Sequence, residues 1–461
     1  MSGFGFTPSE DPNDDGSGEK KPAENPFGNF GDVFQQFSGM GLNLQGLMAA
    51  LSGQKSPASL SREMIRDISK KFLTAHGELP LSIADLTLSK EALDIADLWI
   101  NEATSFPPLA ISENCALSRR EWIDSTLTGW EEIAKPLVEG MSDAMAAMLK
   151  ENLGDGSIPL NEMELPGFNL PGFNLPGFNM PGSGIQIPQS VLATVMGTFM
   201  SSLISSQLGQ TIGNLSTTVT GSNDVALPLT EEIRIGLIPQ NVTLWGADLG
   251  IDASEIRIYL ALREIAAARL FVGAPWLRAY IRSAISSYGK GIRVDITAIT
   301  EQAQEAMNSG ELDPANPESL TLALTGGLFT PEETPAQKAA LENLETVLAL
   351  IEGWIDSVVA LAAKDRLPSM TRLRETQQRR RATKSPTQEL FASLVGLEVS
   401  PRKTREAISF WEKVVELRDV KSRDEIWDEA LLLPRADQLG DVERYLQSRT
   451  VPDDLSGLTD N

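Results

Sequence analysis

The pattern of apolar and polar positions along the chain is typical of an α-helical protein. Between residues 59 and 153, apolar residues recur every three or four positions, which is the spacing of one helix face. Ser61, Ser89 and Ser118 each stand directly before such a run. Serine is a preferred N-cap because its hydroxyl accepts a hydrogen bond from a free N–H of the first turn. We therefore predict a helical region over 59–153 whose helices begin after these serines.

The most apolar stretch runs from residue 250 to residue 288 and predicts a long buried helix. Gly273-Ala274-Pro275 breaks the pattern, and Trp276 opens a second helix. Another long helix is predicted from Pro335, because a proline in the first turn has no N–H bond to lose. The only strand signal covers Ile233 to Ile238, and Pro239 ends it. The expected fold class is therefore mainly α, with one small β element before the 250–288 helices.

The stretch from residue 187 to residue 215 is apolar on all sides but carries many Ser, Thr, Gly and Gln residues. These small and polar side chains favour a helix buried between other helices over a membrane hairpin, because hydroxyls and amides are unfavourable in lipid. We assign residues 186–450 to one helical domain.

Four further segments differ from this pattern. Residues 1–25 are expected to be disordered because they carry few apolar residues, and residues 451–461 form an acidic tail. In the Phe/Met/Gly-rich segment 26–58, Phe27–Phe37 places an aromatic stripe on a short helix that docks onto its own domain or captures a partner. In the loop at 154–185, Leu165–Gly182 repeats LPGFN turns that serve as a spacer or as a recognition segment.

Composition narrows the possible functions. The net charge of −24 over 461 residues argues against nucleic acid or an anionic membrane as partner. The single Cys115 excludes an internal disulfide and fits a reducing compartment. The single His76, placed before Gly77 at an expected helix end, excludes a zinc site with two or three histidines from one chain. With no signal peptide apparent, we expect a cytoplasmic protein.

The segments REIAAARLF, APWLR and LIEGW follow one another in this order along the chain. With the segments around them they resemble the actinobacterial zincin-like metallopeptidase family (type 2), whose members are described as zinc-dependent metalloproteases or hydrolases. The resemblance extends over nearly the whole chain from Asn25. It implies a zincin-like helical domain. The most specific pieces are REIAAARLF, APWLR and LIEGW.

In relatives that bind metal, the first of these pieces reads H-E-x-x-H, and the LIEGW piece supplies a glutamate as third ligand. Carried onto this chain, the resemblance assigns the ligand positions to Arg263, Ala267 and Glu352, and the general-base position to Glu264. An arginine stays protonated and has no free lone pair, and an alanine offers only a methyl group. We therefore expect no metal cofactor here, although the relatives use zinc.

Arg263 also falls on an apolar stripe of its helix, where an unpaired guanidinium would be costly. Glu352 is the expected anionic partner, and Asp356 lies on the same helix face one turn further on. We predict an ion pair between Arg263 and Glu352. The alternative is that the Arg263 side chain extends to solvent and contacts neither carboxylate.

Three functions remain open. The first is an inactive zincin-like homologue that acts as an interaction or regulatory protein, with Phe27–Phe37 or Leu165–Gly182 as contact surfaces. The second is a hydrolase of another type that uses Glu264, Glu352 and Asp356 as acid and base in the inherited cleft. The third is nucleic-acid binding through the basic stretch from residue 366 to residue 384. We expect that stretch to be a solvated connection instead, because it lacks interleaved aromatic residues.

Overall fold

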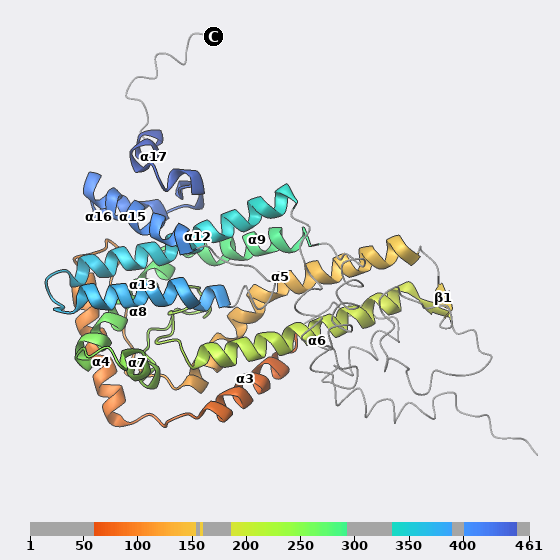
Figure 1. The fold of residues 1–461 in the computed structure, drawn as a ribbon, viewed down its shortest axis with the longest axis horizontal. Coiled ribbons are helices and arrows are strands. Elements are labelled where there is room, and N and C mark those ends of the chain that lie inside the picture. Colours follow the sequence, from red (N-terminus) through yellow and green to blue (C-terminus); the bar gives the residue numbers. More distant parts are fainter. Residues whose placement is uncertain (1–59, 154–156, 160–185, 293–333, 390–400, 450–461) are drawn as a thin grey trace, which may run out of the picture.

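The computed structural model describes residues 60–153, 157–159, 186–292, 334–389 and 401–449 (Figure 1). The predicted disordered tail at 1–25, the Phe27–Phe37 stripe, the LPGFN repeats at Leu165–Gly182 and the acidic tail at 451–461 lie outside the described residues.

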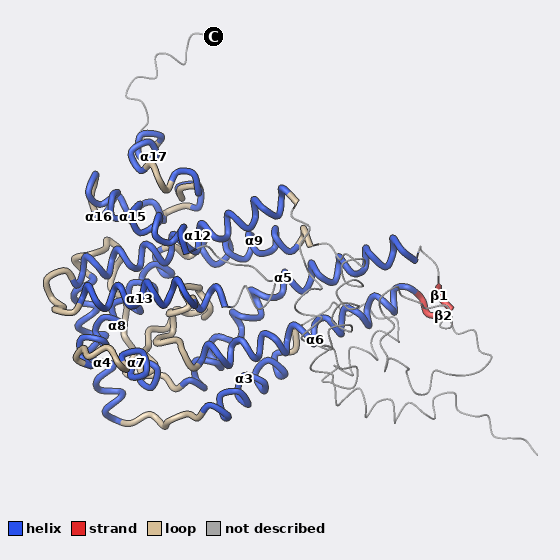
Figure 2. The backbone as a smooth tube through the Cα atoms, in the orientation of Figure 1, coloured by secondary structure: helices blue, strands red, loops and turns tan. Residues whose placement is uncertain are grey.

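The described part of the chain is mainly helical, as the sequence predicts (Figure 2). Its α-helices are α3 Arg62–His76, α4 Ile83–Ile100, α5 Arg119–Leu153, α6 Gln189–Ser216, α7 Pro239–Gly246, α8 Ala253–Gly273, α9 Leu277–Gly289, α12 Pro335–Ala363, α13 Met370–Lys384, α15 Pro401–Leu417, α16 Val420–Asp424 and α17 Val442–Ser448. Short 3-10 turns cover Glu425–Trp427, Ala430–Leu432 and Ala436–Gln438. Two short strands, β1 Ser157–Pro159 and β2 Gln186–Pro188, pair antiparallel between α5 and α6.

The N-caps explain where the first helices begin. Ser61 accepts a hydrogen bond from the Met64 amide, and Ser118 does the same for the Glu121 amide, so both predicted starts are confirmed. The start predicted after Ser89 is wrong, because Ser89 lies inside α4. That helix begins about two turns earlier at Ser82, which forms a capping box with Asp85 and so satisfies two orphan N–H donors.

The single histidine and the single cysteine both have structural positions. His76 ends α3, where its Nδ1 lies 2.9 Å from the Phe72 carbonyl oxygen, and Gly77 follows with a positive φ of 78°. Cys115 is fully buried, its carbonyl accepts a hydrogen bond from the Leu237 amide, and burial raises the pKa of its thiol. A thiol with a raised pKa is a poor nucleophile.

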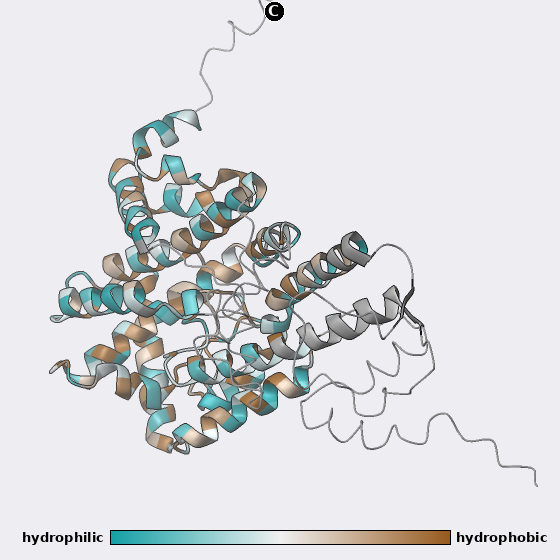
Figure 3. Cartoon of the chain, turned by 45° about the vertical axis from the view of Figure 1, so that its right-hand side comes forward, coloured by the Kyte–Doolittle hydropathy of each residue, from teal (hydrophilic) through white to brown (hydrophobic). Residues whose placement is uncertain are grey.

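Two long helices and a central helix organise the molecule. Helices α5 and α6 run side by side toward the β1–β2 pair, and α3 packs against both of them (Figure 1). Helix α8 lies among α4, α7, α12 and α13, while α9 packs between α5 and α12. Many outer helices are hydrophilic on one side and hydrophobic on the other, as expected for helices around one core (Figure 3).

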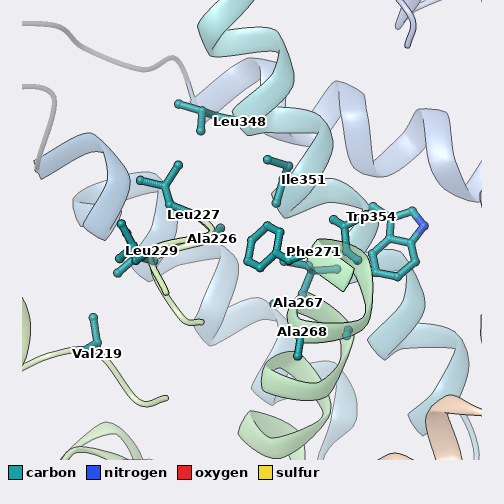
Figure 4. Packing of buried hydrophobic residues seen from close by; sticks show 14 of the residues in the cluster. Val219, Ala226, Leu227, Leu229, Ala267, Ala268, Phe271, Leu348, Ile351 and Trp354 are labelled. Atoms are coloured by element: carbon teal, nitrogen blue, oxygen red, sulfur yellow. The ribbon is translucent and has the colours of Figure 1, made fainter. Parts of the chain in front are cut away.

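Helix α8 is buried on all sides from Tyr259 to Phe271, as its apolar pattern predicts. Its Ala267, Ala268 and Phe271 gather with Leu348, Ile351 and Trp354 of α12 in one apolar cluster (Figure 4). Among the described helices, α12 is long and apolar enough to cross a membrane by length and composition, but 83% of its most apolar window is buried inside the protein. It is therefore accounted for as a core helix.

The predicted β element at 233–238 is an extended segment that lies between residues 115–117 and residues 220–222. Leu237 exchanges hydrogen bonds with Cys115 and Leu117 on one side, and Gly236 and Ile238 bond with Ser222 and Thr220 on the other. Only isolated bridges result, from Leu237 to Ala116 and Gly221. This small ladder fixes the loop that lies over the centre of α8.

Candidate functional site

The predicted ion pair between Arg263 and Glu352 is confirmed. The Arg263 Nη2 lies 2.5 Å from Glu352 Oε1, and the two side chains are 6% and 15% exposed. Helix α8 presents the arginine and the facing turn of α12 presents the glutamate. Arg263 is thus an internal cation, and the alternative in which it extends to solvent is excluded.

The pair belongs to a larger network that includes a second arginine and a second carboxylate. Arg381 of α13 places its Nε 3.4 Å from Glu352 Oε1 and its Nη2 2.5 Å from Asp224 Oδ1. Asp224 also accepts hydrogen bonds from the amide and hydroxyl of Thr220 at 2.8 and 3.1 Å. Two cations and two anions therefore alternate along the series Arg263, Glu352, Arg381 and Asp224.

This alternation keeps both carboxylates ionised. Burial by itself raises the pKa of Glu352, but the guanidinium groups of Arg263 and Arg381 outweigh it and hold that pKa below its ordinary value. The same balance lowers the pKa of Asp224, where burial is opposed first by Arg381 and then by the Thr220 amide. Burial also opposes the charge of Arg263, yet the facing carboxylates raise its pKa further.

Glu264 is held by the loop segments that cross over α8. Its carboxylate accepts hydrogen bonds from the Asn223 amide at 2.9 Å, the Asn223 side-chain Nδ2 at 2.8 Å and the Gly236 amide at 3.1 Å. Gly221 lies so close to this carboxylate that a Cβ there would overlap with Oε2. The residue at the general-base position thus fastens the 220–237 loop to α8.

Burial dominates the titration of Glu264, which is 3% exposed. Loss of hydration raises the pKa of Glu264 to about 8, and the three N–H donors oppose that rise without cancelling it. A carboxyl group with this pKa is suited to proton transfer near neutral pH. Its three polar partners are all donors to it, however, so its oxygens are occupied by the fold.

The residues present do not fit a zinc ion at the position that the resemblance assigns. Arg263 is a cation and Ala267 has no lone pair, while Glu352 is bound by two guanidinium groups. Within the described ranges, no group of three or more His, Cys, Asp or Glu residues is placed to hold a metal ion. The cavity between Arg263, Glu264 and Ala267 has a volume of about 10 Å³, the lower limit for one water molecule.

A larger cleft of about 450 Å³ lies beside this small cavity. Glu352, Asp356 and Arg381 line it, whereas Glu264 is not among its described lining residues. Asp356 is bound by Arg374 at 2.6 Å and by Gln378 at 3.3 Å. Burial raises the pKa of Asp356, and Arg374 opposes that rise. Of the three carboxylates proposed from the sequence, Glu264 and Asp356 therefore line different cavities, and Glu352 lines both.

The basic stretch is not a solvated connection, and that prediction is wrong. Residues 370–384 form α13, and its Arg374 and Arg381 point into the molecule, where they pair with buried carboxylates. The sequence signal for this was weak, because six basic residues on a polar helix are typical of an exposed surface. Asp224 and Asn223 also went unrecognised, although Asp224 ends a stretch of residues without charge.

Comparison with known proteins addresses the fold and the family of the chain. The fold is similar to a crystal structure from Chloroflexus aurantiacus described as "a putative hydrolase with a novel fold", with a TM-score of 0.55, 15% identity, and coverage of 85% of this chain and 100% of that one. At this identity the likeness shows the fold alone. No curated protein matches the sequence. The sequence model of the zincin-like metallopeptidase family matches residues 65–446, so the chain belongs to that family.

Proposed function

We propose that this protein is a zincin-like family member without metallopeptidase activity that acts as an interaction or regulatory protein. The network of Arg263, Glu352, Arg381 and Asp224 carries this proposal, because it joins in a buried charge pair two of the residues, Arg263 and Glu352, that the resemblance assigns to ligand positions. Without a metal, Glu264 has no bound water of lowered pKa to activate. The protein keeps the fold and a cleft of about 450 Å³, which are the parts that binding requires.

The first experiment measures zinc in the purified protein and in variants that restore the ligands. Wild type is expected to hold well under one zinc per chain and to leave a peptide library uncut. The double variant Arg263→His/Ala267→His, which keeps Glu352, offers three ligands and is expected to gain zinc. Arg263→His alone is the matched control, because it removes the same guanidinium but adds only one histidine. One zinc per wild-type chain with peptide hydrolysis would refute the proposal.

The second experiment tests the interaction role. Phe27–Phe37 and Leu165–Gly182 are the proposed contact surfaces, and a reducing cytoplasm is the proposed compartment. Tagged wild type and a variant with Phe30 and Phe34 replaced by serine are cross-linked in native cells and analysed by mass spectrometry. A partner recovered only with wild type supports the role. If wild type recovers nothing above an untagged control, the interaction role fails.

A second candidate function is a metal-free hydrolase that uses Glu264, Glu352 and Asp356. The raised pKa of Glu264, about 8, is the observation that favours it. The separation of Glu264 from the larger cleft and its three N–H donors argue against it. Turnover of esters, glycosides or peptides that Glu264→Gln abolishes would establish it, and no turnover by wild type would end it.

A further inference from the structure

A second cavity, of about 520 Å³, shares Arg379 and Arg381 with the cleft. Its walls come from the last two turns of α13, from α7, and from Thr217 and Thr218 just beyond α6. Arg379, Arg380 and Arg381 all line it, against only two carboxylates, Asp224 and Glu389. This is an unusual concentration of positive charge in a chain whose net charge is −24.

Arg380 is the cation in this cavity that the fold leaves without an anionic partner. Its guanidinium stacks 4.5 Å from the ring centre of Trp245 and donates to the Trp245 carbonyl at 2.8 Å. Among the described residues, no carboxylate lies within 4.0 Å of it, whereas Arg379 and Arg381 each pair with one. Burial lowers the pKa of Arg380, so its charge is already poorly hydrated.

Arg119 is a second arginine without a carboxylate partner among the described residues, and its positive charge lies next to Asn241 of the cavity lining. Arg119 is 3% exposed and donates to Asn241 Oδ1 at 2.7 Å and to the Gly77 carbonyl at 2.9 Å. Asn241 lines the cavity. Within the described ranges, Arg119 has no carboxylate within 4.0 Å, and burial lowers its pKa despite the nearby Glu78. A buried cation with only dipolar partners favours an anion placed nearby.

The volume of the cavity and its apolar lining residues indicate the size and the apolar part of a ligand that would fit it. A volume of about 520 Å³ is in the range of small-molecule sites and exceeds what one inorganic anion fills. Leu244, which is 56% exposed, and the ring of Trp245 form an apolar side of the cavity. An exposed leucine beside an unpaired guanidinium matches a ligand with an apolar body and a charged end.

We propose that this cavity binds a small organic anion, whose phosphate or carboxylate group is bound by Arg380 and whose apolar body lies against Leu244 and Trp245. Neither Arg263 nor Glu352 is among the described lining residues of this cavity, although Arg381 and Asp224 of their network are, so the proposal does not rest on the loss of zinc. Arg380 offers its remaining N–H donors as a planar fork, the geometry that binds both anionic groups.

Isothermal titration calorimetry of the full chain with inorganic phosphate, phenyl phosphate, benzoate and neutral benzyl alcohol tests the proposal. Saturable binding is expected for phenyl phosphate or benzoate, and the tighter of the two identifies the charged group. Inorganic phosphate should bind more weakly and benzyl alcohol not at all. Affinity should also fall as salt increases, because the cavity is partly open to solvent.

Two variants separate the parts of the site. Arg380→Gln keeps a donor but removes the charge, and should weaken binding about tenfold or more. Leu244→Ser changes an exposed residue, and should bring phenyl phosphate down to the affinity of inorganic phosphate. Arg402→Gln is the matched control, because Arg402 is an exposed arginine of α15 outside the cavity. Circular dichroism confirms that each variant is folded.

Three results would overturn the proposal. The first is no saturable binding of phenyl phosphate or benzoate at millimolar concentration. The second is an affinity that Arg380→Gln and Arg402→Gln change equally. The third is binding of benzyl alcohol as tight as that of phenyl phosphate, which would make the cavity an apolar site only.

Discussion

The substitution Arg263→Met tests whether the charge network holds the centre of the fold together. Methionine fills a similar length without charge and leaves Glu352 buried, with Arg381 at 3.4 Å as its remaining cation. Breaking a buried pair by removing one partner typically costs about 3–5 kcal/mol. Two features should reduce this cost here. Arg381 remains as a cation beside Glu352. The substitution also removes two buried guanidinium nitrogens, Nε and Nη1 of Arg263, that have no hydrogen-bond partner among the described residues. We therefore expect a loss of roughly 2–3 kcal/mol in the free energy of unfolding.

A double-mutant cycle isolates the pair. Glu352→Gln leaves Arg263 as the uncompensated charge and should cost about 3–5 kcal/mol. The double variant Arg263→Met/Glu352→Gln removes both charges, so its stability should return to within about 1 kcal/mol of wild type. The coupling energy between the two substitutions is then about 4 kcal/mol or more, which exceeds the range typical of residues in contact because each single variant leaves a buried charge without its partner.

Urea unfolding at several pH values is the assay. The pKa of Glu352 is held below its ordinary value of 4.5, so the pair stabilises the fold above that pH and the contribution is lost as pH falls through the lower folded-state value. The cost of Arg263→Met should therefore be greatest near pH 7 and smaller in acid. Arg402→Met is the control, because its exposed pair with Glu406 should be worth about 0.5 kcal/mol or less. Additive costs equal to this control would refute the buried network.

Three further predictions follow from named contacts. Gly221→Ala should lower the free energy of unfolding by about 1–3 kcal/mol, because its Cβ overlaps with the Glu264 carboxylate. Gly440→Ala is the control and should be close to neutral in the same urea titration, because no atom of the described residues lies within contact distance of its Cβ. The pKa of Glu264 is about 8 when folded and 4.5 ordinarily, so the folded state holds the extra proton and stability should fall as pH rises between these values; Glu264→Gln should remove that slope. Asp424→Ala should cost about 3–5 kcal/mol in thermal or urea unfolding, because this buried carboxylate accepts hydrogen bonds from Thr104 and Trp354 and pairs with Arg423. No loss would contradict its role in joining the segment at Thr104 to α12 and α16.

The helices follow from local features of the sequence. Ser61 and Ser118 mark helix starts because a cap hydroxyl satisfies a nearby N–H, whatever the rest of the chain does. The break between α8 and α9 likewise needs only Gly273 and Pro275. Ser89 misled the prediction, since it fits the same rule but the earlier Ser82 has an acidic partner in register. Competition between two local caps is decided by which one completes its hydrogen bonds.

The sequence by itself also determined that Arg263 needs an anionic partner, because its charge falls on an apolar helix stripe. It likewise excluded a zinc site with two histidines from one chain, because the chain has a single histidine. Only the tertiary structure decided which anion serves Arg263. In the folded chain Arg263 forms its ion pair with Glu352, and Asp356 forms an ion pair with Arg374. Arg381 pairs with Asp224, which lies 157 positions away in the sequence. These pairings depend on how α8, α12 and α13 pack, and a Coulomb interaction depends on distance in space, which sequence separation does not fix. For the same reason the sequence did not show that Arg374 and Arg381, within a basic stretch typical of a surface, pair with buried carboxylates.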